Sequence, residues 1–142
     1  MKIYLAGPIR KKEINQKLAN IMRSKGHDVY VPMELKIENA WDLPNSVWGK
    51  QVFEHDLQAI NEAELVVVSS FDSSDHFGGS GTTWEHGYAY GINKKIVVVH
   101  FEEQGTSLMI ANSCNTSVRN IDDFEKLDLN NLQDNYCDME QT

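Results

Sequence analysis

A glycine-rich stretch between two short apolar runs restricts the fold more than any other part of the sequence. The runs are residues 65–68 (LVVV) and 96–99 (IVVV), and residues 78–91 between them read GGSGTTWEHGYAYG. Two such runs separated by a helix-length segment are typical of a strand–helix–strand unit with parallel strands. In an open parallel sheet, ligands bind at the carboxyl ends of the strands, where these glycines would allow the backbone to approach closely.

The same alternation continues along the chain. We expect strands at residues 2–6, 28–32, 65–70 and 96–100, with a weaker one at 117–118. We expect helices at residues 11–25, 46–63, 82–91, 107–112 and 121–133. This order predicts an α/β fold, a doubly wound, flavodoxin-like parallel sheet of about five strands with flanking helices. The length of 142 residues suits one domain over residues 1–142.

Glu85 occupies an unexpected position in the predicted helix 82–91. Thr82 or Thr83 is expected to open this helix, which would place Glu85 in its first turn. The residues at i+3, i+4 and i+7 from Glu85 are Tyr88, Ala89 and Ile92. The carboxylate therefore shares the face that should pack on the sheet. An exposed glutamate that satisfies helix amides is the alternative reading, and His86 beside it is expected to face outward.

A second acid, Asp56, also lies on the apolar face of a predicted helix. The predicted helix 46–63, capped by Asn45 or Ser46, has an apolar stripe of Phe53, Leu57 and Ile60, and Asp56 stands within it. Carboxylates are almost never fully buried without a partner. Two acids on the inner faces of helices that flank one strand predict a cleft. The segment 33–45 has no periodic pattern and is expected to form a lid or a binding wall.

Composition excludes several classes of partner and site. The chain has 13 basic and 21 acidic residues and a formal charge of −8, which argues against nucleic acid polymers and anionic membranes as partners. Cys114 and Cys137 lack metal or redox spacing, so reduced thiols in a cytoplasmic protein are expected. No apolar segment approaches 18 residues, about the length that a membrane-spanning helix requires. His55 and Asp56 are adjacent and point about 100° apart on a helix, so they are not expected to hold a metal together. No other cofactor is expected.

Four patches of the sequence together resemble one protein family. They are residues 3–7 (IYLAG), Trp48 with Asp56 eight residues later, residues 81–89 (GTTWEHGYA) and residues 107–109 (SLM). This combination resembles the nucleoside 2-deoxyribosyltransferase superfamily, which includes the deoxynucleoside 5'-monophosphate N-hydrolases. The patches span most of the chain, and the one around Glu85 is the most specific.

The resemblance implies an enzyme and assigns three catalytic roles. Glu85 would attack the anomeric carbon of a 2'-deoxynucleoside and form a covalent deoxyribosyl-enzyme as the base departs. Tyr4 would orient that carboxylate, and Asp56 would protonate the leaving base or bind a sugar hydroxyl. Attack on the intermediate by another base gives transfer, whereas attack by water gives hydrolysis. The implied ligands are therefore small: a nucleoside or nucleotide and a nucleobase.

The resemblance also implies binding residues. Trp48 would line the base site, although core packing is the alternative reading. In the hydrolases, the residues matching Gly7, Ile9 and Arg10 hold a 5'-phosphate. The family's pocket is completed by a neighbouring subunit, here through Ser107 and Met109, which implies a homo-oligomer with shared active sites.

The glycine loop departs from the transferase pattern. Many transferases have an aspartate six residues before the nucleophile, where this chain has Gly79. Asp75, with Asp72 further upstream, is the candidate replacement. Gly81 opens the glycine and threonine patch that carries the resemblance, and it completes the predicted binding residues.

Three functions are consistent with these residues. The favoured one is transfer of 2-deoxyribose between nucleobases, as in purine or pyrimidine salvage. The second is hydrolysis of deoxynucleoside 5'-monophosphates, which Arg10, Gly79 and Ser107 favour. The third is a nucleotide-binding sensor without turnover, against which the presence of both Tyr4 and Glu85 argues.

Overall fold

The computed structural model describes residues 1–72 and 79–134. The strands are β1 (Lys2–Ala6), β2 (Asp28–Tyr30), β3 (Leu65–Ser70), β4 (Lys95–His100) and β5 (Thr116–Val118). The α-helices are α1 (Lys12–Ser24), α2 (Asn45–Glu62), α3 (Ser80–Gly91), α4 (Leu108–Asn112) and α5 (Ile121–Glu125). Asp75 and Cys137, both named above, lie outside the described residues.

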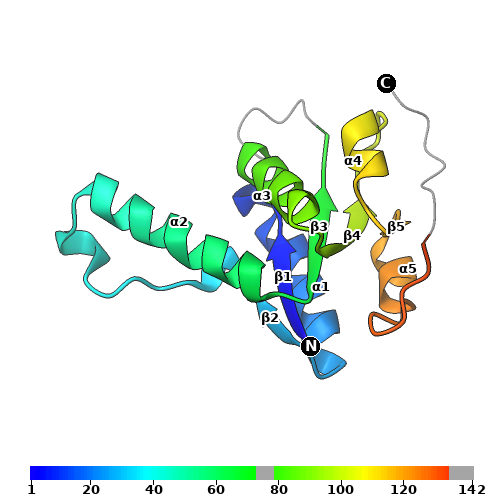
Figure 1. Ribbon diagram of the computed structural model, residues 1–142, viewed down its shortest axis with the longest axis horizontal. Coiled ribbons are helices and arrows are strands. Elements are labelled where there is room, and N and C mark those ends of the chain that lie inside the picture. The colour runs from blue at the N-terminus through cyan, green and yellow to red at the C-terminus, as the bar shows by residue number, and fades with distance from the viewer. Residues whose placement is uncertain (73–78, 135–142) are drawn as a thin grey trace.

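The five strands form one parallel sheet in the order β2-β1-β3-β4-β5 (Figure 1). The chain passes from β1 to β2 on one side and then continues from β3 on the other side of β1, so the strand order reverses between β1 and β3. The predicted doubly wound, flavodoxin-like fold is confirmed. At such a reversal the loops that follow the two strands diverge and leave a crevice for a ligand.

Helices cover both faces of the sheet, which explains the unbroken apolar runs of the central strands. On one face, Ile3 and its strand neighbours pack with α1 and with Phe124 of α5. On the other face, Tyr4 packs with Ile60 of α2 and Ala89 of α3. Fully burying one large apolar side chain contributes about 1.5–3 kcal/mol. The two clusters therefore fix the helices that border the crevice.

Helix α3 begins earlier than predicted. Its first residue is Ser80, and its N-cap is Gly79, whose φ of 132° is readily adopted only by glycine. Thr82 and Thr83 therefore lie inside the helix, and neither opens it. The first turn contains no acidic residue, so the expectation that Glu85 lies in the first turn is wrong.

Two other helix boundaries differ from the predictions. Helix α2 follows Pro44 as its N-cap and has no side-chain cap, so capping by Asn45 or Ser46 was wrong. Helix α5 ends at Glu125, well before the predicted end at residue 133. Lys25 Nζ donates to the carbonyls of Glu125 at 2.5 Å and Leu127 at 2.9 Å. These carbonyls are thereby satisfied without further helical turns.

The segment before α2 contains little regular structure. Strand β2 ends at Tyr30, earlier than predicted, because Pro32 has no N–H for the sheet and instead starts a 3₁₀ turn, Pro32–Glu34. A second 3₁₀ turn covers Ala40–Asp42. The expected loop is therefore present but includes two short helical turns.

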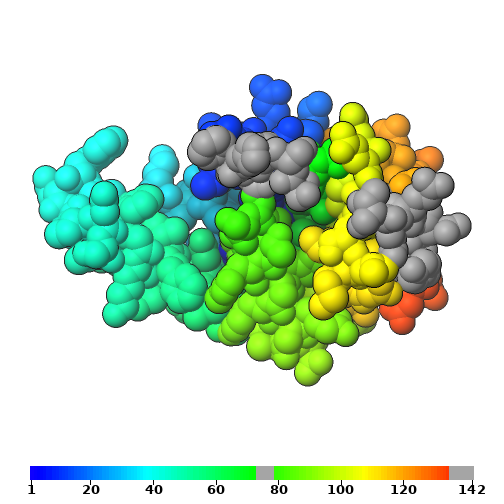
Figure 2. Space-filling model, turned by 90° about the horizontal axis from the view of Figure 1, so that it is seen from above, coloured from blue at the N-terminus to red at the C-terminus, as the bar shows by residue number. Residues whose placement is uncertain are grey.

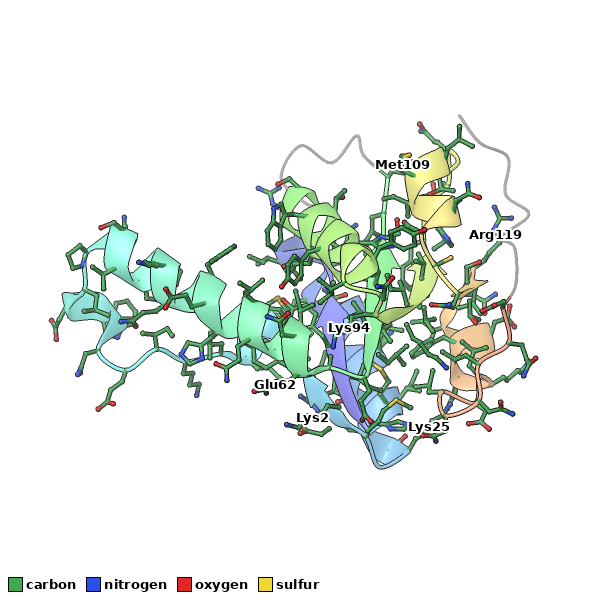
Figure 3. All side chains as sticks on the ribbon, viewed as in Figure 1. Lys2, Lys25, Glu62, Lys94, Met109 and Arg119 are labelled. Atoms are coloured by element: carbon green, nitrogen blue, oxygen red, sulfur yellow. The ribbon has the colours of Figure 1, made fainter. Side chains whose placement is uncertain are left out.

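Helix α2 projects from the body of the molecule as an arm, together with the segment before it (Figures 1 and 2). Its carboxyl end is held to neighbouring elements. Tyr88 Oη of α3 donates to Asn61 Oδ1 at 2.8 Å, and Lys94 Nζ donates to the carbonyls of Asn61 at 2.7 Å and Ala63 at 2.8 Å. Figure 3 shows Lys94 at this end of the helix, close to Glu62. Among the described residues, none of the helices combines the length and apolar character that crossing a bilayer requires.

A buried polar network holds the loop that follows β1. Asn15 Nδ2 donates to the Pro8 carbonyl at 2.9 Å, and Ser69 Oγ donates to Asn15 Oδ1 at 2.7 Å. The loop lies so close to these side chains that a Cβ atom on Gly7 would be 2.4 Å from both Asn15 Oδ1 and Ser69 Oγ. Glycine is therefore required here for space.

We expect Gly7→Ala to lower the free energy of unfolding by about 1–3 kcal/mol, since the new methyl group must displace buried, hydrogen-bonded atoms. Chemical denaturation would measure this change. The matched control is Gly49→Ala in α2, where no described atom lies within 4 Å of the added Cβ. That control should be neutral or stabilising by up to about 1 kcal/mol. Equal stabilities for wild type and Gly7→Ala would contradict the packing argument.

Candidate active site

A cavity of about 610 Å³ lies where the loops after β1 and β2 meet α2 and the start of α3. Figure 2 looks down on the edge of the sheet where it opens, with the α2 arm to one side. The cavity brings together seven of the predicted site residues: Gly7, Ile9, Trp48, Asp56, Gly79, Gly81 and Glu85. The crevice expected from the strand order is therefore a real cavity with two carboxylates in its wall.

Glu85 lies on the inner face of α3, as the periodicity predicted. The buried residues of this helix are Thr82, His86 and Ala89, and Glu85 shares their side. Burial raises the pKa of Glu85 to about 7; the Tyr4 hydroxyl opposes this rise as a hydrogen-bond donor, and the charge of Asp56 adds to it. A carboxylate held in this way is poorly solvated when ionised and is correspondingly reactive towards an electrophilic carbon.

Tyr4 is fully buried next to Glu85. Burial raises the pKa of Tyr4, and the nearby charges of Glu85 and Asp56 raise it further. Within the described residues, Tyr4 Oη and Glu85 Oε2 are both buried without a hydrogen-bond partner of standard geometry. The Tyr4 hydroxyl is therefore close enough to influence the Glu85 carboxyl, while Glu85 Oε2 remains able to accept a further hydrogen bond.

Asp56 is held by a tyrosine that the sequence analysis missed. Tyr30 Oη donates to Asp56 Oδ1 at 2.8 Å. Burial raises the pKa of Asp56, although the bond from Tyr30 opposes this. Tyr30 is the direct neighbour of Tyr4 across the β1–β2 ladder, and their rings stack with centroids 5.4 Å apart. Aligning the two predicted strands would have placed these two hydroxyls side by side.

A second, mostly apolar cavity of about 370 Å³ reaches the same two acids from between α2 and α3. Phe53 and Trp84 border it, with ring centroids 5.5 Å apart, and each is 50% exposed. Trp84 also stacks on Tyr88. Asp56 and Glu85 therefore line both cavities and can be reached from either one.

The cation that borders the main cavity is Lys12. Arg10, which the resemblance to the hydrolases assigns to a 5'-phosphate, is exposed and is not among the lining residues. Lys12 lines the cavity with Gly7 and Ile9, because the 3₁₀ turn Ile9–Lys11 rotates the chain between residues 10 and 12. Trp48 also lines the cavity and is 43% exposed, which disfavours the core-packing reading.

Ser107 and Met109 lie apart from the cavity, on the other side of α3 from the arm. Ser107 Oγ accepts a hydrogen bond from Met109 N at 3.2 Å and caps α4. Met109 is 79% exposed, and Figure 3 shows it at the outer edge of α4. Within one chain, these two residues do not border the site with Glu85. No group of three metal-ligating side chains suitable for an ion occurs in residues 1–72 and 79–134.

His86 is buried, so the expectation that it faces outward was wrong. It is 2% exposed, and its Nε2 lies 2.7 Å from the Ser113 carbonyl oxygen. The inner face of α3 consists of residues 82, 85, 86 and 89, which includes His86. Ile92, which the sequence analysis put on this face, follows the helix and is 37% exposed.

Comparisons with known proteins found a matching family and similar solved structures. A model of the nucleoside 2-deoxyribosyltransferase family matches residues 3–130. Among solved structures, a 2-deoxyribosyltransferase from the psychrotolerant bacterium Bacillus psychrosaccharolyticus superimposes with a TM-score of 0.83 at 26% identity, covering 96% of this chain and 99% of that chain. Comparison with curated protein sequences gave no match.

Two more distant structures share the fold. A CMP N-glycosidase from Clostridium botulinum has a TM-score of 0.63 at 19% identity, over 89% of this chain and 96% of that chain. A 2-deoxyribosyltransferase from Leishmania mexicana has a TM-score of 0.54 at 17% identity, over 72% of this chain and 66% of that chain.

We expect Glu85→Gln to be more stable than wild type above pH 7. The pKa of Glu85 is about 7 in the folded protein and 4.5 ordinarily, so the folded state retains a proton that the unfolded state releases between these values. The free energy of unfolding therefore falls as the pH rises from about 4.5 to about 7.

Glutamine cannot ionise, so the variant avoids this loss. We expect its free energy of unfolding to exceed that of wild type by about 1–3 kcal/mol at pH 8 and to differ little at pH 4. Thermal unfolding at both pH values would measure the difference. The control, Glu38→Gln, neutralises an exposed glutamate in the segment before α2. A stability gain of the same size at pH 4 and pH 8 would show that ionisation of Glu85 is not its cause.

Proposed function

We propose that this chain, which belongs to the nucleoside 2-deoxyribosyltransferase family, transfers 2-deoxyribose from a 2'-deoxynucleoside to another nucleobase. The observation that carries this proposal is the buried Glu85 carboxyl beside Asp56 in the wall of a cavity large enough for a nucleoside. The likeness to the Bacillus transferase, over nearly the whole of both chains, supports transfer.

In the first half of the reaction, one Glu85 carboxylate oxygen attacks C1' of the sugar and forms a C1'–O bond. The C1'–N bond breaks, and its electron pair leaves with the base. In this scheme the two interacting carboxyls share one proton. With that proton on Asp56, Glu85 is free to attack, and Asp56 donates the proton to the departing base.

In the second half, a nitrogen of the acceptor base attacks C1', and the C1'–O electron pair returns to Glu85. The proton that the acceptor loses goes to Asp56, which restores the pair. Attack by water at the same step would release free 2-deoxyribose. Since each half inverts C1', the product keeps the configuration of the substrate.

The other predicted residues have supporting roles in this scheme. The Tyr4 hydroxyl steers the Glu85 carboxyl towards the sugar, and Trp48 offers a flat ring for stacking against a base. Ser107 and Met109 lie outside the cavity of their own chain, and we assign them to the pocket of a neighbouring copy. This assignment agrees with the exposure of Met109.

We expect wild type to convert deoxyinosine and free adenine to deoxyadenosine and hypoxanthine, and Glu85→Ala to lose at least about 10³-fold of this activity, since no other group supplies the covalent bond. Chromatography of the four compounds would measure it. The control, Glu125→Gln, neutralises an exposed glutamate of α5 that does not line the cavity, and it should be as active as wild type. Tight nucleoside binding without base release by wild type would instead indicate a sensor.

A second function is favoured by one observation, the presence of Lys12 in the cavity wall near Gly7 and Ile9. A cation at that position offsets the two carboxylates and would attract a 5'-phosphate. The chain would then hydrolyse deoxynucleoside 5'-monophosphates by the same Glu85 chemistry, with water as the acceptor.

If this second function applies, Lys12→Gln should lower kcat/KM for deoxyinosine monophosphate by about 10-fold or more and leave kcat/KM for deoxyinosine nearly unchanged, because only the phosphate needs the cation. Steady-state base release from both substrates would measure this. The control is Lys17→Gln, an exposed lysine of α1 that does not line the cavity. Equal losses for both substrates would exclude a phosphate-specific role of Lys12.

A further inference from the structure

His86 makes a part-buried hydrogen bond between the nucleophile helix and Ser113, the C-cap residue of α4. Its Nε2 lies 2.7 Å from the carbonyl oxygen of Ser113 and 3.1 Å from Ser113 Oγ. A carbonyl can only accept, so Nε2 carries the proton and donates it. Burial lowers the pKa of His86, and the nearby His100 lowers it further, against the opposing effect of the Ser113 bond. The imidazole is therefore neutral, with a fixed tautomer.

This bond controls the orientation of α3 at the residue next to Glu85. Helix α3 has no side-chain N-cap. In the part of the chain that the structure describes, His86 and Tyr88 of α3 form side-chain hydrogen bonds to other elements. Tyr88 holds the helix to the end of α2, whereas His86 holds it to α4. Together they fix rotation of α3 about its axis, and that rotation sets the direction of the Glu85 side chain.

The element on which His86 anchors α3 is itself held firmly. Before α4, Thr106 Oγ1 donates to Glu102 Oε1 at 3.1 Å, and His100 Nδ1 lies 3.0 Å from Glu102 Oε2. Ser70 Oγ at the end of β3 also donates to Glu102. Burial opposes ionisation of Glu102, but the bonds from His100 and Ser70 outweigh it and lower the pKa of Glu102. The start of α4 is thereby tied to β3 and β4.

An apolar side chain would fill the position of His86 at a lower desolvation cost. A buried imidazole is tolerated here because its Nε2–H donates a hydrogen bond. Without this donor, the Ser113 carbonyl at the carboxyl end of α4 would lose its partner. The polar link is therefore the property that distinguishes histidine from leucine here.

We propose that His86 is a positioning residue, which fixes Glu85 for attack by locking the nucleophile helix onto α4 through the Ser113 carbonyl. Its effect on turnover rests on the function proposed above, while its effect on the environment of Glu85 does not. Because Met109 lies in α4 and Ser107 caps that helix, the same bond sets the position of these residues relative to Glu85 within the chain.

Two variants of His86 separate the donor from the bulk of the side chain. In His86→Leu the donor is absent. In His86→Gln the Nε2 amide is the same number of bonds from Cα as the imidazole Nε2 and can donate to the same carbonyl. We expect His86→Leu to lower kcat about 10²-fold with little change in KM, as for a misplaced reacting group. His86→Gln should retain kcat within about threefold.

The pKa of Glu85 supplies a readout that requires no turnover. We expect His86→Leu to lower this pKa from about 7 towards the ordinary 4.5, since a carboxyl that leaves its buried position becomes better solvated. Carboxyl carbon NMR of wild type, His86→Leu and His86→Gln across pH 3 to 9 would measure it. His86→Gln should keep the wild-type value.

A stability control excludes a general loss of structure. Phe124→Leu creates a void in the core cluster on the opposite face of the sheet, and it should lower the melting temperature without changing kcat or the pKa of Glu85. If His86→Leu keeps both the kcat and the Glu85 pKa of wild type, the positioning role is wrong. The role is equally wrong if His86→Gln loses as much kcat as His86→Leu.

Failure of the proposed function has a different signature. If wild type released no base from any donor while the Glu85 pKa still fell in His86→Leu and not in His86→Gln, the positioning role would stand and the assigned reaction would not. If wild type is active and both readouts are unaffected in His86→Leu, the reaction stands and the positioning role does not.

Discussion

The burial of Glu85 next to Asp56 is the interaction on which the rest of the structure depends. Ionised carboxylates are costly to remove from water, and two of them close together repel. Tyr30 supplies a hydrogen bond to Asp56, and Tyr4 lies against Glu85. The apolar packing on both sides of the five-stranded sheet holds the two helices in place in spite of this cost. Stability is thereby reduced by a pair of carboxyls in the wall of a cavity, a loss of the kind found at functional sites.

The fold and the centre of the site could be predicted because they leave strong marks in the sequence. Buried parallel strands must be apolar on both faces, so their runs are unbroken. Glu85 and Asp56 each interrupt an apolar stripe, and a conflict between residue type and helix face identifies such groups. Both were placed in one cleft from periodicity alone, and both line the cavity.

The remaining details depend on local geometry that periodicity does not encode. Whether Arg10 or Lys12 borders the cavity is decided by one 3₁₀ turn. The inner position of His86 follows from the way α3 packs on the sheet, with Thr82, His86 and Ala89 buried. Tyr30 became visible only through the strand register. Segments held by tertiary contacts likewise cannot be predicted from a local pattern. An example is the end of α5, where the Glu125 carbonyl accepts a hydrogen bond from Lys25.

The α2 arm has a consequence for how substrate preference can change. Trp48 and Asp56 lie on one rigid helix whose carboxyl end is held by Tyr88 and Lys94, whereas Glu85 belongs to the body of the protein. A small change of angle at that attachment moves the outer wall of the cavity in proportion to distance along the helix. The width of the cavity can thus be adjusted from a site remote from Glu85, while the Glu85 carboxyl keeps its place.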